Sequence, residues 1–87
     1  MINPAVTALT HASKIVASAG FGVMPSQESA TKARDAVQYV DPAWRRQVTT
    51  VISALEMGLM PKPDLCGEAF AHLDTARKAH LAQPVIH

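Results

Sequence analysis

The chain has 87 residues, which is enough for one domain but close to the lower limit for a self-sufficient hydrophobic core. Its eight basic and seven acidic side chains give a net charge of +1, so it lacks the strong positive field that holds nucleic acid or an anionic membrane. The single cysteine excludes an internal disulfide, and no apolar run approaches the roughly 18 residues that a membrane span needs. The N-terminus also lacks the pattern of a signal peptide, so we expect a cytoplasmic protein with no membrane contact.

The first predicted helix covers residues 4–19. Asn3 is a favourable N-cap, and Pro4 suits the first helical position because that position needs no backbone donor. Gly20 supplies the left-handed conformation that commonly ends a helix. The apolar stripe at helical spacing consists of Leu9, Ala12, Val16 and Ala19.

The second predicted helix covers residues 27–40. Ser26 is its predicted N-cap, and Glu28 lies four residues before Lys32, the favourable order for a helix ion pair. The helix should end before Asp41-Pro42, because the residue that precedes a proline is pushed out of the helical region. Its apolar stripe consists of Ala30, Ala33, Val37 and Val40.

The third predicted helix covers residues 42–57. Asp41-Pro42 repeats the start signal of Asn3-Pro4, with Asp41 as the predicted cap, and Gly58 ends the helix. It carries the strongest apolar stripe of the chain, which predicts that it is the central core helix. This stripe consists of Trp44, Val48, Val51, Ile52 and Leu55.

The fourth predicted helix covers residues 65–82 and follows a stiff linker with two prolines. Asp64 is its predicted N-cap, and Pro84 stops it, which leaves residues 83–87 as a short C-terminal tail. Its predicted inner face consists of Leu65, Ala69, Phe70, Leu73, Ala76 and His80.

These four segments predict an all-α fold over residues 1–87, a single helical domain. The connections of two to six residues suit neighbouring packed helices, so we expect a small compact four-helix bundle or an orthogonal helical array. The pattern alone does not choose between these two. The sequence shows no alternating strand pattern and no evident internal repeat.

Few side chains offer catalytic or ligand chemistry. Cys66 lies at the start of the fourth helix, where the helix dipole favours a lowered thiol pKa, but no histidine lies nearby in sequence to act as a base. The four histidines have neither paired-cysteine nor HExxH spacing, although Glu68 and His72 are one turn apart. Residues 20–22 follow a helix instead of preceding one, so they do not fit a phosphate loop. We therefore expect no enzyme activity, no metal and no cofactor.

A first set of candidate partner-binding residues stands at the start of the third helix. Arg45 and Arg46 place positive charge where it opposes the helix dipole. Asp41 lies four residues before Arg45 and offers it a partner, whereas Arg46 has no local partner. Two arginines beside Trp44 match the residue types enriched in protein-interface hot spots.

A second set of candidates consists of apolar residues outside the helices: Phe21, Val23, Met24, Leu59, Met60, Val85 and Ile86. These residues either fold back over the small core or form an exposed patch, and such a patch marks a binding surface. Fifteen alanines leave little apolar area per residue to bury, which favours a homo-oligomeric interface.

The sequence favours a small non-enzymatic protein-interaction module, a self-associating regulator, inhibitor or adaptor of a larger partner protein. One alternative is a helix-turn-helix regulator that reads nucleic acid with the helix at residues 42–57. Another is a sequestering protein that holds a small anionic ligand with Arg45 and Arg46 at a subunit interface.

Overall fold

The computed structural model describes residues 3–82, and these residues form four α-helices, two 3₁₀-helices and no strand. The helices are α1 (Pro4–Gly20), α2 (Gln27–Ala33), α3 (Arg45–Glu56) and α4 (Pro63–Leu81), with η1 (Arg34–Tyr39) and η2 (Pro42–Trp44) between α2 and α3. The prediction of a small all-α bundle or array is confirmed. No helix among the described residues is both long enough and apolar enough to cross a membrane.

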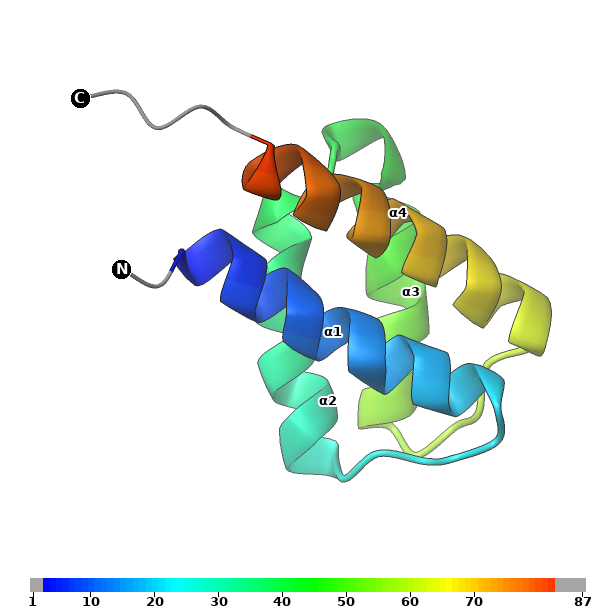
Figure 1. Cartoon of the computed structure of the whole chain (residues 1–87). Coiled ribbons are helices and arrows are strands. Elements are labelled where there is room, and N and C mark those ends of the chain that lie inside the picture. Colours follow the sequence, from blue (N-terminus) through cyan, green and yellow to red (C-terminus); the bar gives the residue numbers. More distant parts are fainter. Residues whose placement is uncertain (1–2, 83–87) are drawn as a thin grey trace.

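The helices form two layers (Figure 1). In one layer α1 and α4 run antiparallel, and in the other α2 with η1 runs antiparallel to α3. The layers cross, so the core lies between them and the arrangement is an array of crossed helices. The packing of α1 on α4 is the most extensive helix contact in the described chain.

The predicted caps hold the first turns of three helices. The side-chain oxygens of Asn3, Ser26 and Asp41 each accept a hydrogen bond of 2.9–3.1 Å from a backbone N–H of the following turn. These bonds satisfy donors that have no partner inside the helix. Three of the predicted start positions therefore have the geometry that their residue types favour.

The predicted cap of the fourth helix is wrong by two residues. α4 begins at Pro63, and Lys62 occupies its N-cap position without a side-chain hydrogen bond. Pro63 takes the first helical position, where its missing N–H is no loss. Asp64 consequently lies in the first turn, where its negative charge suits the helix dipole.

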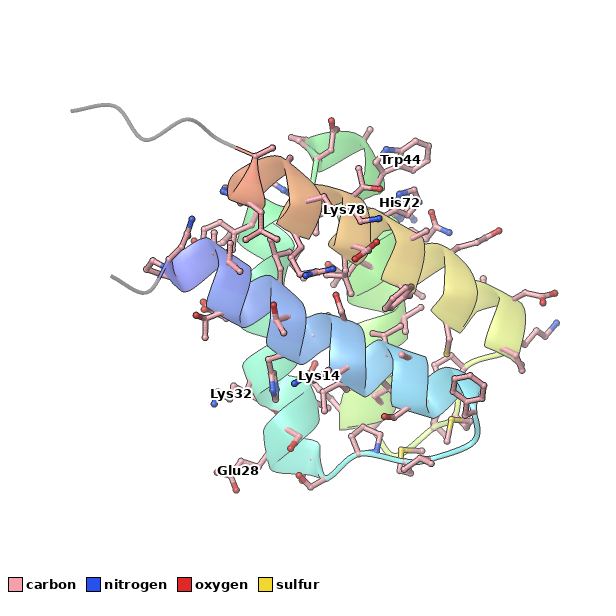
Figure 2. All side chains as sticks on the ribbon, viewed as in Figure 1. Lys14, Glu28, Lys32, Trp44, His72 and Lys78 are labelled. Atoms are coloured by element: carbon pink, nitrogen blue, oxygen red, sulfur yellow. The ribbon has the colours of Figure 1, made fainter. Side chains whose placement is uncertain are left out.

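The predicted second helix divides into α2 and η1, because the backbone tightens into 3₁₀ geometry from Arg34 to Tyr39. Val40 then turns to extended backbone ahead of Asp41-Pro42. The predicted ion pair between Glu28 and Lys32 is not present among the described residues. Figure 2 shows these two side chains lying apart on the outer side of α2.

The core consists largely of the residues that the helical spacing selects. The predicted stripes of the first three helices are buried, with Val37 half-buried and Trp44 the one exposed member. Trp44 is 47% exposed because it ends the 3₁₀ turn η2, which precedes α3 and breaks the helical spacing of the stripe. On α4, Leu65 and Phe70 were predicted to face inward, but they are 39% and 37% exposed.

The structure also reveals an internal repeat that contradicts the sequence expectation. The loops after α1 and α3 contain GVMP at residues 22–25 and GLMP at residues 58–61, and 58 minus 22 gives an offset of 36 residues. Six pairs of buried residues share this offset: Ala12 and Val48, Val16 and Ile52, Ala19 and Leu55, Ala30 and Cys66, Ala33 and Ala69, and Val40 and Ala76. The chain therefore contains two copies of a helix–loop–helix unit, α1 to η1 and α3 to α4.

Candidate functional site

The loops that follow α1 and α3 have the same backbone geometry. Gly22 and Gly58 have φ values of +88° and +75°, in the left-handed region that favours glycine. In each loop the glycine N–H and the next N–H donate to two carbonyls of the last helical turn, which is a Schellman motif. Gly20, the predicted end of the first helix, is still helical, and Gly22 makes the turn instead.

Each loop presents three apolar side chains at equivalent positions. The residue before the glycine, the residue after it and the methionine are all exposed, and corresponding positions have similar exposed fractions. The pairs are Phe21 (89%) with Met57 (69%), Val23 (58%) with Leu59 (58%), and Met24 (39%) with Met60 (42%). The alternative in which the loops fold back over the core is therefore wrong for these residues, because the Schellman turns direct the chain away from it.

An apolar groove lies beside these loops, between the end of α1 and the start of α4. It has a volume of about 370 Å³ and is lined by Val16, Ala17, Gly20, Phe21, Pro63, Cys66, Gly67 and Phe70, none of which is charged. A Cβ added at Gly67 would meet no atom within 4 Å, so the absence of a side chain there leaves open space. We call the six exposed loop side chains, together with Phe70 in the groove, the loop-end surface.

Cys66 belongs to the groove wall and to the core. The residue is 1% exposed. A Cβ added at Gly20 of α1 would lie 3.5 Å from the Cβ of Cys66. Burial raises the pKa of the Cys66 thiol. The expected lowering by the helix dipole is therefore wrong, because desolvation of the thiolate is the larger effect.

A polar cluster joins the end of α3 to the junction of α2 and η1, within one layer. Arg34 is hydrogen-bonded and ion-paired with Glu56, and its Nη2 also donates to the Ser53 hydroxyl at 2.9 Å. The hydrogen bond from Arg34 lowers the pKa of the Glu56 carboxyl. The sequence pattern does not indicate this cluster, because Arg34 lies 19 residues from Ser53 and 22 residues from Glu56 along the chain.

The candidate residues at the start of α3 have separate roles. Trp44 stacks on His72 of α4, with ring centroids 4.4 Å apart and planes 10° apart, and Figure 2 shows the two side chains next to each other. Arg45 donates from Nε to the Val40 carbonyl at 2.9 Å and from Nη2 to the Gln38 carbonyl at 3.0 Å. It thereby caps the end of η1.

The pairing of Arg45 with Asp41 that the sequence suggested is absent from the described residues. The side chain of Arg46 is exposed, and in residues 3–82 it makes no hydrogen bond or ion pair. The three adjacent candidates therefore do not form one site: Trp44 faces α4, Arg45 supports the backbone, and Arg46 faces solvent.

A second pocket, of about 260 Å³, lies between η1, η2 and α4. Its walls include Trp44 and His72, together with Tyr39 and His80, whose rings meet edge to face with centroids 5.7 Å apart. Within residues 3–82, no group of three or more His, Cys, Asp or Glu side chains is placed to hold a metal ion.

Of the apolar candidates, Phe21, Met24 and Met60 belong to the loop-end surface, whereas Val85 and Ile86 lie outside the described residues. Sequence reasoning missed Met57, which falls at the end of a predicted helix, and Phe70, which was predicted to lie in the core. The repeated Gly-aliphatic-Met-Pro sequence is the signal that identifies the two loops as equivalent. Searches against protein-family models, curated proteins and solved structures gave no significant match.

Proposed function

We propose that this chain is a non-enzymatic protein-interaction module of the cytoplasm, a regulator, inhibitor or adaptor that binds another protein chain through the loop-end surface. The observation that carries the proposal is the matched exposure of large apolar side chains on two equivalent loops. Single exposed apolar residues are common on any protein, but a set concentrated on two equivalent turns is typical of a binding surface.

Burial energetics support a protein partner. Covering the exposed part of a side chain such as Leu59, which is 58% exposed, contributes roughly 2 kcal/mol, at about 25 cal/mol for each Å² removed from water. The Schellman turns hold both loops in place before binding, so less conformational entropy is lost when a partner is bound. Three of the side chains, Met24, Met57 and Met60, are methionines, whose flexible thioethers adapt to the shape of a partner.

The chemistry of the surface also defines the partner segment. None of the seven side chains of the loop-end surface carries a charge, so the partner should present apolar residues without a buried charge of its own. Nucleic acid and small anions have weaker support. Arg45 already donates to two carbonyls, which leaves Arg46 as the member of that pair whose side chain makes no hydrogen bond within residues 3–82.

A site-specific crosslinking experiment tests the proposal. A photoreactive amino acid at position 59, expressed in the source cell, should give a covalent adduct with a protein, identified by mass spectrometry. The same amino acid at position 81 is the matched control, because Leu59 and Leu81 are both 58% exposed. Equal adduct yields at the two positions would contradict the proposal.

Binding of the identified partner gives the quantitative test. We expect the double substitution Val23→Ser and Leu59→Ser to weaken the dissociation constant at least tenfold by calorimetric titration, and Leu81→Ser to change it less than twofold. If the affinity instead falls with Arg46→Ala and is unchanged in the loop variants, the binding surface is the start of α3 and the proposal is wrong.

A further inference from the structure

The repeat allows the groove to be compared with its counterpart in the same molecule. The end of α1 meets the start of α4, and the equivalent end of α3 meets α2 and η1. With the offset of 36 residues, Gly20 corresponds to Glu56, Ala17 to Ser53, and Phe70 to Arg34. The two junctions are thus built on equivalent backbone positions with different side chains.

One junction is bridged by polar side chains and the other is not. At the end of α3, Arg34, Glu56 and Ser53 link the helices by hydrogen bonds and an ion pair. At the end of α1 the equivalent positions carry a phenyl ring and two residues with little or no side chain, and an apolar groove remains. Side chains of this fold can therefore bridge two helices at such a junction. The unbridged groove at the end of α1 is not a requirement of the fold.

Phe21 lies at the rim of this groove and is 89% exposed. Its neighbours Gly20 and Gly22 leave both sides of the ring uncovered by adjacent side chains. An exposed aromatic ring beside an uncharged groove is self-complementary, which is the property that a twofold-symmetric interface requires. Because each copy carries both a ring and a groove, each copy can insert its ring into the groove of the other.

We infer that the partner seated on the loop-end surface is a second copy of this chain, with the Phe21 ring of each copy in the groove of the other. This inference rests on the proposed role of that surface in protein binding. It adds the identity of the partner and the contact that determines specificity.

The exposed area is sufficient for such a pair. The seven side chains of the loop-end surface expose about 600–800 Å² together, taking roughly 150–200 Å² for each fully exposed large side chain. A standard interface buries about 800 Å² on each partner, whereas the largest apolar patch on a typical monomer is about 300–600 Å². None of the seven side chains is charged, so covering them with a second copy removes no charge of their own from water.

Sedimentation equilibrium over a concentration series tests the inference. The wild-type chain should show a mass that rises from monomer to dimer. Phe21→Ala removes the ring and Gly67→Leu fills the groove, so each should weaken dimerisation at least tenfold. Leu81→Ala is the control and should change dimerisation less than twofold, because Leu81 lies at the far end of α4, away from the groove.

Mixing the two disruptive variants gives the sharpest result. The Phe21→Ala chain keeps an open groove, and the Gly67→Leu chain keeps the ring, so the mixed pair restores one of the two reciprocal contacts. We expect the heterodimer to form more tightly than either variant homodimer. Circular dichroism of each variant at a concentration where it is monomeric shows that the fold is retained.

Three results would overturn the inference: a wild-type monomer at high micromolar concentration, dimerisation that is insensitive to both variants, or no gain on mixing them. The crosslinking experiment separates this failure from failure of the proposed function. An adduct at position 59 with a different protein leaves the loop-end surface as a binding surface and removes only its assignment to a second copy.

Discussion

The indole of Trp44 stacks on the imidazole of His72, with centroids 4.4 Å apart and planes 10° apart. This contact joins the turn before α3 to the middle of α4. We expect His72→Ala to lower the free energy of unfolding by about 1 kcal/mol, because stacked aromatic pairs contribute roughly 0.5–1.5 kcal/mol beyond the area that they bury. A double-mutant cycle with Trp44→Ala, followed by urea unfolding, measures the coupling. Additive effects would show that the stack contributes nothing.

The two adjacent arginines should differ in their effect on stability. Arg45→Ala leaves the carbonyls of Gln38 and Val40 without their donor, and we expect a loss of about 1 kcal/mol because water replaces part of that bonding. Arg46→Ala should change stability by less than about 0.5 kcal/mol, as is usual for an exposed side chain. Chemical denaturation of both variants checks this order, and equal losses would contradict the capping role of Arg45.

The ion pair of Arg34 with Glu56 predicts a pH dependence of stability. The pKa of Glu56 is lowered in the folded state by its hydrogen bond from Arg34, so its contribution is present above the unfolded-state pKa of about 4.3. That contribution is lost as the pH falls through the lower folded-state pKa. The wild-type chain should therefore melt at a higher temperature than Glu56→Gln at pH 7, and the difference should vanish near pH 2. A gap that persists at that pH would show that the charge of Glu56 is not responsible.

Alanine at three glycines should give effects of opposite sign. Gly22→Ala and Gly58→Ala force an L side chain into left-handed backbone and should each destabilise the fold by about 1 kcal/mol. Gly67→Ala lies inside α4 with open space around the new Cβ, so it should stabilise the fold by up to about 1 kcal/mol. Thermal unfolding of the three variants, at concentrations below any self-association, provides the measurement.

Helix existence could be predicted because the capping residues act locally. Asn3, Ser26 and Asp41 each bind donors within three residues, so adjacent sequence carries the information. Trp44 was misplaced because the 3₁₀ turn at η2 interrupts the spacing on which the stripe was counted.

The groove could not be predicted from periodicity because its main feature is missing side chains at two distant positions. Gly20 and Gly67 lie 47 residues apart in sequence and meet only when α1 packs on α4. The repeat is not evident from the sequence of the helices, because equivalent core positions carry different apolar residues, such as Ala19 and Leu55. Burial, which only the structure supplies, shows that these positions are equivalent.

Helices of one unit pack on helices of the other unit, and this has a consequence for how the chain folds. The principal neighbour of α1 is α4, and that of α3 is the segment of α2 and η1, so α1, α3 and α4 each pack mainly on a segment of the other unit. An isolated half would lack the contact of α1 with α4, which is the most extensive helix contact in the described chain. We therefore expect neither half to fold independently, and folding to require a cooperative step in which the first and last helices close a long loop.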